Sequence, residues 1–368
     1  MHDPYRALYI HLPFCKQRCL YCDFETEAIA ADDAYVSSYA ERLVGEIRSA
    51  AREGELAEVQ TVYFGGGTPS YVPRVLTQLL YTLSLSMHLT NEIECSVEAN
   101  PESLTSSLVH DIWALGANRL SLGAQSFDDD VLRILGRIHS ADDALRALDA
   151  AFERFENVSV DLMCGIPGQS LDSLEASVRR AIDSGVAHVS IYPLTIEAGT
   201  PFYSMVDKGE MPLPNDDTQA EHMQLAARLL TDAGFHRYEV ASYTKPGFEC
   251  RHNTAYWTGV PYLGLGTSAV TMTQNSERRM RKQHDQITDD LDARLMMAED
   301  LMLRMRMSAG VPNEMVERAC AILPATISTL EDLVERGLVV HEQDAWKPTE
   351  QGWLCGNELY GSLFDLAP

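Results

Sequence analysis

The feature that most constrains the fold of this chain is a regular alternation between short apolar runs and longer stretches with helical spacing. Buried parallel strands are almost continuously apolar, and helices connect one such strand to the next. Six runs fit these strands, at residues 8–12, 59–64, 93–99, 119–122, 158–163 and 188–194. The stretches that fit helices lie between them, at residues 33–53, 72–87, 103–115, 141–155 and 171–183. The pattern predicts an α/β fold with a parallel sheet covered by helices.

The number of strand–helix units limits how far this sheet can close. Six units are two short of the eight that close a TIM barrel, so we expect a partial (β/α)6 TIM-like barrel. Its functional site should lie on the loops that follow the carboxyl ends of the strands. We divide the chain into this barrel at residues 1–200, a β-rich α+β extension at 201–288 and a C-terminal helical, winged-helix-like domain at 289–368.

The extension and the C-terminal part do not continue the strand–helix alternation of the barrel. A helix predicted at residues 217–233 leads into a β-rich run at 238–243. A stretch rich in Gly, Pro and aromatic residues, at 245–267, is typical of a loop region. The basic segment 277–282 fits a solvated turn or hairpin. From residue 289 onward, helices followed by two short strands and a last helix resemble a winged-helix module, which here lacks a basic recognition helix.

Charge and hydropathy exclude several functional classes. The chain has 29 Lys and Arg against 54 Asp and Glu, a net charge of −25, which argues against a nucleic-acid partner. No apolar run approaches the ~20 residues that cross a bilayer, so we expect no transmembrane segment and leave peripheral membrane contact open. The start has no signal-peptide pattern, which predicts a cytoplasmic protein with reduced thiols.

Three cysteines are crowded into the loop after the first strand. Cys15, Cys19 and Cys22 form a C-x3-C-x2-C pattern that suits a [4Fe-4S] cluster, which usually has four Cys ligands. With three, one iron is left open for an outside ligand, and the amino and carboxylate groups of S-adenosylmethionine can fill that position. An electron from the cluster can then cleave the sulfonium to give a 5′-deoxyadenosyl radical. The remaining cysteines are scattered and fit packing roles: Cys95, Cys164, Cys250, Cys320 and Cys355.

Zinc is the alternative occupant of this loop. His11 or a distant cysteine would then supply the fourth ligand. Zinc sites usually show paired ligand clusters, and the sequence contains no second CxxC and no HxxxH. The spacing therefore favours the iron–sulfur cluster.

Glycines and polar residues follow the other predicted strands. Gly66, Gly67 and Thr68 would bring backbone groups close to a ligand, and could hold the amino group of the bound sulfonium. Glu98 ends the third strand and could accept hydrogen bonds from ribose hydroxyls. The others follow the fourth strand or lie on the fifth: Gln125, Arg137, placed to pair with a carboxylate, and Asp161. We expect all of them at one barrel mouth, above the cysteine loop.

On these motifs and the segment Tyr9-Ile10-His11-Leu12-Pro13-Phe14, the chain resembles the radical S-adenosylmethionine superfamily. Within it, the resemblance is to the family of oxygen-independent coproporphyrinogen III oxidase and related haem chaperones, and it runs nearly end to end. The resemblance implies a [4Fe-4S] cluster on the three cysteines. It also implies S-adenosylmethionine contacts at Tyr9, Gly66, Gly67, Thr68, Glu98, Gln125, Arg137 and Asp161.

Several features separate the two branches of that family. The oxidase has Gly and a fourth Cys after the third cluster cysteine, where this chain has Asp23-Phe24, and it also has a longer N-terminal extension. The segment from His252 to Trp257 matches the HNxxYW motif that the chaperones link to haem binding. The resemblance thus implies haem on His252, with Cys250 as an alternative ligand. Val270 stands where the family usually has a histidine, and His284 could replace it.

The resemblance favours a haem chaperone that passes haem to an unknown acceptor protein, with an electron donor such as flavodoxin or ferredoxin. The alternative is the oxidase, an enzyme that decarboxylates propionates by a radical mechanism. Its polyanionic substrate would need several cations, and the predicted strand ends offer chiefly Arg137. A zinc-bound structural or DNA-binding protein is a third reading, against which the acidic charge and the barrel pattern argue.

Overall fold

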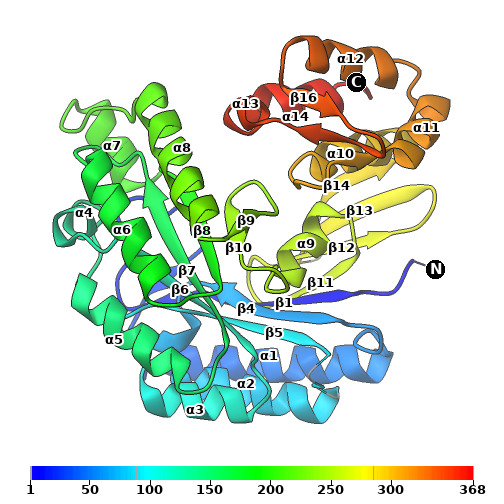
Figure 1. The fold of residues 1–368 in the computed structure, drawn as a ribbon. Helices are drawn as coiled ribbons and strands as arrows, with labels where there is room; N and C mark the ends of the chain where they lie inside the picture. The colour runs from blue at the N-terminus through cyan, green and yellow to red at the C-terminus, as the bar shows by residue number, and fades with distance from the viewer. Residues whose placement is uncertain (1, 88, 91, 285, 368) are drawn as a thin grey trace.

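A large sheet dominates the computed structural model, which describes residues 2–87, 89–90, 92–284 and 286–367 (Figure 1). In these residues the sheet has twelve strands in the order β14-β13-β12-β11-β1-β4-β5-β6-β7-β8-β10-β9. The six central strands are parallel and follow the chain order. They are β1 (Ala7–Leu12), β4 (Thr61–Gly66), β5 (Glu94–Ala99), β6 (Arg119–Gln125), β7 (Asn157–Cys164) and β8 (His188–Pro193). The predicted partial barrel is confirmed.

Helices cover the outer face of these strands, as Figure 1 shows for α1, α2 and α3 below the sheet. Each lies within a few residues of its prediction, because a buried apolar stripe at helical spacing gives a strong signal. These helices are α1 (Ala34–Glu53), α2 (Pro73–Ser86), α3 (Ser106–Ala114), α5 (Ala141–Phe152) and α6 (Leu171–Asp183). Other elements near them are β2 (Phe14–Cys15), β3 (Glu27–Ala28), η1 (Pro69–Tyr71), α4 (Asp129–Ile134), α7 (Pro201–Asp207) and the longer α8 (Asp216–Asp232).

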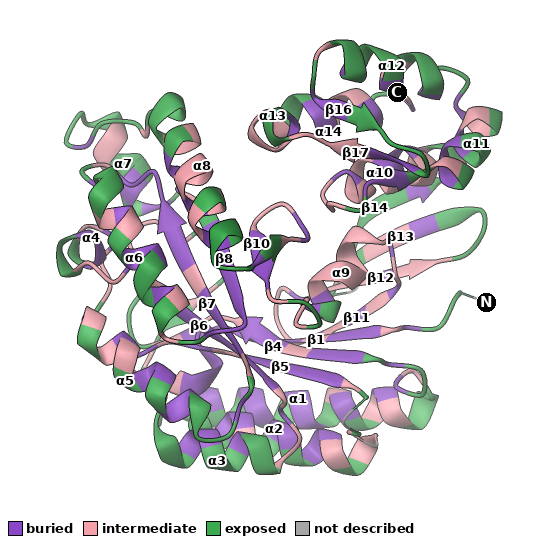
Figure 2. Cartoon of the chain, viewed as in Figure 1, coloured by how far each residue is buried: buried purple, intermediate pink, exposed green. Residues whose placement is uncertain are grey.

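The main core lies between this sheet and its helices, and Figure 2 shows the strands as largely buried. Leu8, Ile10 and Leu12 of β1 are completely buried, as are Val62 and Phe64 of β4. Burying one such side chain contributes about 1.5–3 kcal/mol, so these strands are fixed firmly. The carboxyl ends of the strands meet at one edge, where the loops are free to carry polar side chains.

Strands from the middle of the chain extend the same sheet at both ends. On one side β11 (Tyr262–Leu265) pairs in parallel with β1, and antiparallel strands follow it: β12 (Val270–Gln274), β13 (Arg278–Gln283) and β14 (Gln286–Asp292). On the other side β10 (Ser242–Thr244) pairs with β8 and with β9 (His236–Arg237). Because these strands continue the barrel sheet, the division of the chain at residues 200 and 288 stays a prediction.

The prediction of a loop region at residues 245–267 was wrong. This stretch contains the helix α9 (Arg251–Trp257) and the strand β11. The carboxylate of Glu94 on β5 accepts the backbone N–H groups of Arg251 and His252, each at 3.0 Å, and so completes the first turn of α9. A helix of seven residues is too short for periodicity to reveal, and a contact from a distant strand stabilises it.

The prediction of a solvated turn or hairpin at residues 277–282 was right about the hairpin, because β13 pairs antiparallel with its neighbours β12 and β14, and wrong about full exposure. Within β13 the Arg279 side chain is buried and pairs with Glu299 at 2.5 Å and Asp300 at 2.7 Å. Both carboxylates lie on α10 (Ala293–Arg304), which Figure 1 shows above β13 and β14. A run of basic residues suggests an exposed segment, because the sequence does not show which carboxylates the residues pair with. Here the partners lie some twenty positions away in the sequence.

The C-terminal part has a hydrophobic core of its own, formed by buried side chains between Ala298 and Ala367. Three short strands pair in the order β15-β17-β16 beside the helices, an arrangement like a winged helix. Its elements after α10 are β15 (Val311–Pro312), α11 (Asn313–Ile322), α12 (Thr326–Glu335), β16 (Val339–His341), β17 (Ala345–Pro348), α13 (Glu350–Leu354) and α14 (Gly356–Phe364).

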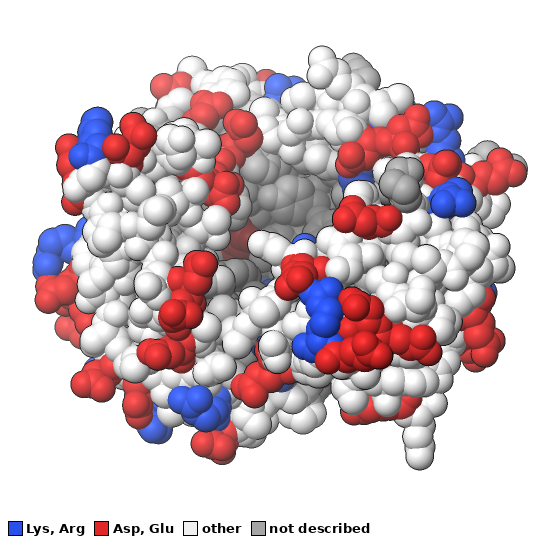
Figure 3. Space-filling view, turned by 90° about the horizontal axis from the view of Figure 1, so that it is seen from above, with Lys and Arg blue, Asp and Glu red and all other residues white. Residues whose placement is uncertain are grey.

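The surface reflects the charge of the chain. Figure 3 shows the molecule from above, with acidic side chains outnumbering basic ones around a central hollow. Within the described residues, no helix is both long enough and apolar enough to span a membrane.

Candidate functional site

The three crowded cysteines lie on a loop that short strands hold at both ends. Cys15 ends β2, which pairs in parallel with β3, so residues 16–26 form a closed loop at the barrel mouth. Cys15, Cys19 and Cys22 are all half-buried and line one cavity of about 370 Å³. Burial raises the pKa of the Cys15 thiol to about 11, and burial also raises the pKa of Cys22. The loop thus presents three thiols to one space.

A chain of polar side chains links two of these thiols across the cavity. Arg137 donates from Nη1 to Cys19 Sγ at 3.3 Å and from Nη2 to Asn100 Oδ1 at 2.8 Å. Asn100 in turn donates to Thr68 Oγ1 at 2.8 Å, which lies 3.4 Å from Cys15 Sγ. Burial disfavours the charged form of Arg137, but Tyr21 and Cys19 outweigh this effect and raise its pKa. Arg137 thus holds a guanidinium against the sulfur of one of the three cysteines predicted to bind the cluster.

The donor set fits a four-iron cluster better than a single metal ion. Each thiolate of such a cluster binds a separate iron, whereas the ligands of a zinc ion converge on one point. In the part of the chain that the structure describes, no three His, Cys, Asp or Glu side chains are grouped to bind one ion. His11, the fourth zinc ligand considered, is tied by its ring nitrogens to Tyr9 Oη at 3.2 Å and the Glu25 carbonyl at 3.1 Å.

Strand register explains why the carboxylates face this cavity. Tyr63 lies opposite Ser96, and because side chains alternate along a strand, Glu98 points to the same side as Tyr63. Tyr63 Oη donates to Glu98 Oε1 at 2.9 Å, and the Gly66 amide donates to Oε2 at 3.2 Å. Burial raises the pKa of Glu98 to about 7; the Tyr63 hydrogen bond opposes this shift, and the charge of Asp161 adds to it.

Gln125 and Asp161 reach the same cavity from β6 and β7. The register between these strands shifts between Leu122 and Gln125, and Gln125 has a φ of 65°, a strained conformation typical of functional loops. Asp161 accepts a hydrogen bond from Ser121 Oγ at 3.2 Å, and burial raises its pKa. The sequence-predicted residues that line this cavity are Cys15, Cys19, Cys22, Gly66, Gly67, Thr68, Glu98, Gln125, Arg137 and Asp161.

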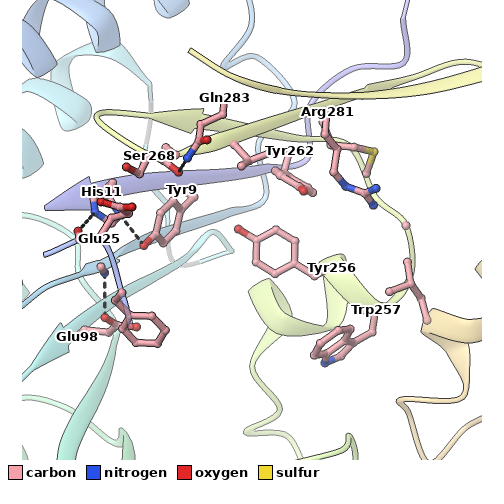
Figure 4. A pocket seen from close by; sticks show the side chains of 17 residues that line it. Tyr9, His11, Glu25, Glu98, Tyr256, Trp257, Tyr262, Ser268, Arg281 and Gln283 are labelled. Carbon is pink, nitrogen blue, oxygen red and sulfur yellow. Dashed lines mark hydrogen bonds between the residues drawn. The ribbon is translucent and has the colours of Figure 1, made fainter. Parts of the chain in front are cut away.

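A second cavity, of about 550 Å³, lies next to the first (Figure 4). Tyr256 and Trp257 of α9 line it together with Tyr9 and Tyr262, and Figure 4 shows Tyr9 and Tyr256 facing one another across it. Aliphatic side chains and glycines complete much of the wall, including Val270, which replaces the family histidine. Tyr9, a predicted S-adenosylmethionine contact, thus belongs to the lining of this larger cavity.

His252 is not among the side chains that line either cavity in the described residues. Its Nδ1 lies 2.9 Å from Thr61 Oγ1 and its Nε2 lies 3.2 Å from Tyr256 Oη, so both ring nitrogens have partners. The ring stacks on Tyr63 with centroids 5.0 Å apart. Burial, helped by the charge of Arg119, lowers the pKa of His252 to about 3. In this conformation the imidazole positions Tyr256 and presents no free nitrogen to a ligand.

Cys250, the alternative haem ligand, is equally enclosed. Its Sγ donates to Glu94 Oε1 at 3.6 Å, and burial raises its pKa to about 12. Cys250, Cys95 and Cys164 are completely buried, which confirms packing roles for these three.

Sequence reasoning did not identify several residues that shape the two cavities. Asn100 follows Glu98 by two positions, but its bridge between Thr68 and Arg137 depends on tertiary contacts. Tyr63 could have been found, because it lies three residues before Gly66 on an inward-facing strand position. Arg281 lines the larger cavity from β13, in the basic segment that the sequence predicts to be a solvated turn or hairpin.

Comparisons with known proteins agree with this arrangement. The profile of the radical SAM superfamily matches residues 9–181, and that of the HemN C-terminal domain matches residues 291–355. The haem chaperone HemW of Bacillus subtilis is 33% identical over 383 residues, covering 97% of this chain and 99% of that protein. The haem chaperone HemW of Escherichia coli is 32% identical over 374 residues, covering 97% of each.

A solved structure supports the fold independently. Coproporphyrinogen III oxidase (HemN) from Escherichia coli, a radical SAM enzyme, superposes with a TM-score of 0.80 at 20% identity, covering 98% of this chain and 90% of that one. At this identity the likeness concerns the fold alone. The near full-length identity to the HemW proteins carries more weight: this chain belongs to the HemW family of the radical SAM superfamily.

Proposed function

We propose that this protein is a haem chaperone that binds one haem in the larger cavity and passes it to an acceptor protein. The observation that carries the proposal is the place of Tyr256 and Trp257, whose motif accompanies haem binding, in the wall of a cavity beside the cysteine loop. Relatives of nearly the same length bear the name haem chaperone HemW. The acceptor, an electron-donor protein and the cytoplasmic location stay predictions.

The smaller cavity would hold the cluster and S-adenosylmethionine. Cys15, Cys19 and Cys22 would each bind one iron of the cluster. When bound, the cluster and S-adenosylmethionine would together provide reductive cleavage of the sulfonium. Glu98 would accept hydrogen bonds from ribose hydroxyls, and its ionised form has the greater acceptor capacity for them. The backbone after Gly66 would approach the amino group closely, since no side chain intervenes there.

The larger cavity has the chemistry of a porphyrin site. Aromatic rings of Tyr256, Trp257 and Tyr262 offer flat apolar surface to a macrocycle. Arg281 provides a cation in the lining for a propionate, and its pairing with Glu299 at 2.8 Å holds it there. Haem ligation by His252 stays a prediction, and it requires the ring to leave Thr61 or Tyr256.

The oxidase alternative fits these linings less well. Coproporphyrinogen III carries several propionates, each of which needs a cation or comparable donor set. Among the described residues, Arg281 is the basic side chain of the larger lining, while Arg18 and Arg137 line the smaller one. Since Arg137 donates to Cys19 and Asn100 and Arg281 pairs with Glu299, these linings offer few cations for a polyanion.

Haem titration of anaerobic, cluster-reconstituted protein tests the proposal. We expect a Soret band that saturates at one haem per chain, and a Trp257→Ala variant that binds haem about ten-fold more weakly. Trp113→Ala is the matched control, because Trp113 is 49% exposed on α3, outside both cavity linings. Absence of stoichiometric haem binding by the wild type, or conversion of coproporphyrinogen III to protoporphyrinogen, would overturn the proposal.

A further inference from the structure

The two cavities are separated by a wall that is a single residue thick in places. Three residues line both of them: Phe24, Gly66 and Glu98. A side chain that contributes surface to two cavities contacts the contents of both. Any ligands that fill the two spaces therefore share these three neighbours.

Two of the three are fixed in place. Glu98 is held through one oxygen by Tyr63 Oη at 2.9 Å and through the other by the Gly66 amide at 3.2 Å. Gly66 has no side chain, and its backbone lies on β4 within the sheet. This part of the wall cannot adapt to an occupant.

Phe24 is the adaptable part. Its backbone is held, since Arg18 Nη2 donates to the Phe24 carbonyl at 3.4 Å and Arg18 Nε donates to the Cys22 carbonyl at 3.2 Å. Its side chain, in contrast, is 63% exposed and belongs to none of the hydrophobic clusters of the described residues. Among the other exposed aromatic residues, Tyr81 lies on the outer helix α2, and Tyr192 of β8 lines the smaller cavity alone. Phe24 is the exposed ring that borders both cavities, and a ligand in either one would cover it.

We infer that Phe24 couples the two sites, so that S-adenosylmethionine in the smaller cavity strengthens haem binding in the larger one. The inference rests on the proposed function. The first ligand covers one side of the ring and restricts its rotamers. The second ligand then meets an ordered apolar surface and does not bear that entropy cost again. Coupling of this kind is reciprocal, so haem strengthens S-adenosylmethionine binding by the same factor.

The experiment uses the full chain with its cluster reconstituted and no reductant, so that S-adenosylmethionine stays intact. Haem affinity is measured from the Soret band with and without saturating S-adenosylmethionine, and S-adenosylmethionine affinity is measured with and without haem. We expect the haem Kd to fall about 5-fold or more in the first pair, with an equal change in the second. Phe24→Ala should reduce both changes to less than about 2-fold, within the range of no coupling.

Two further variants make the result specific. Phe24→Leu keeps an apolar side chain and should retain binding of both ligands with part of the coupling. Tyr81→Ala removes an aromatic ring that is 56% exposed on α2 and should keep the full coupling. A wild-type haem Kd that S-adenosylmethionine leaves unchanged, or equal coupling in Phe24→Ala, overturns the inference while the proposed function stands. Failure of the wild type to bind haem at all overturns both.

Discussion

Gly66 and His11 are packed so closely that a Cβ atom on Gly66 would lie 2.4 Å from His11 Cε1. Gly66 also has a φ of +110°, a backbone conformation that residues with a side chain rarely adopt. The His11 ring cannot retreat easily, because it is buried and bonded to Tyr9 Oη and the Glu25 carbonyl. A residue with a side chain at position 66 would therefore clash with His11, so this part of the wall between the two cavities requires glycine.

Gly66→Ala should destabilise the fold through both the backbone strain and the clash with His11. We expect a loss of about 2–4 kcal/mol in denaturant unfolding of the metal-free protein. Gly185→Ala is the matched control, since Gly185 has a φ of +88° with no atom within 4 Å of an added Cβ, and it should cost only about 1–2 kcal/mol. Equal losses in the two variants would contradict the contact.

Affinity for S-adenosylmethionine should fall as the pH drops through neutrality. Glu98 has a pKa raised to about 7 by burial, so it is ionised at pH 8 and protonated at pH 6. The protonated form loses acceptor capacity for two ribose hydroxyls, which should weaken binding about ten-fold between these pH values. Calorimetric titration of the cluster-loaded protein checks this, and Glu98→Gln should show no such trend. A flat wild-type profile would show that this carboxylate does not contact the ligand.

The barrel and the cysteine cavity could be predicted from the sequence because their signals are local. Several functional residues lie at or near the carboxyl end of an apolar strand, as Glu98 does on β5, and parallel strands bring these ends together. The C-x3-C-x2-C spacing likewise carries its meaning within eight positions. Such patterns do not depend on knowing distant partners.

The larger cavity could not be predicted because distant contacts build it. The short helix α9 depends on Glu94, more than 150 positions earlier, to bind its first amides. Arg279 is buried only because Glu299 and Asp300 neutralise it. The motif histidine, His252, looked like a free ligand in the sequence, whereas packing against Tyr63 and Tyr256 encloses it.

The buried imidazole of His252 should make the protein sensitive to acid. Its pKa is lowered from 6.5 to about 3 by burial, so below pH 6.5 the unfolded chain binds a proton that the folded chain does not. Stability should therefore fall by about 1.4 kcal/mol per pH unit from this group between pH 6 and pH 4. Denaturant unfolding across this range should show a shallower decline in stability for His252→Gln. The slope should differ from that of the wild type by the contribution of about one proton. Parallel declines would mean that the ring is protonated in the folded state.

The ion pairs of Arg279 should be essential for holding α10 on β13. Its guanidinium is completely buried between Glu299, Asp300 and the Gln274 amide oxygen, which accepts from Nε at 3.0 Å. Removing the cation leaves two carboxylates facing a buried space, and such a loss typically costs about 3–5 kcal/mol.

Arg279→Met is the variant that tests this, because it keeps most of the volume and removes the charge together with its hydrogen bonds. We expect denaturant unfolding to report a loss of about 3 kcal/mol or more for the C-terminal part. Arg133→Met is the control, since the Arg133–Asp130 pair at 2.6 Å is mostly exposed and should contribute less than about 1 kcal/mol. Haem titration of the same variant adds a second readout, because Glu299 also holds Arg281 in the larger cavity. Comparable stability of Arg279→Met and Arg133→Met would show that packing of apolar side chains, and not this cation, fixes α10 on the sheet.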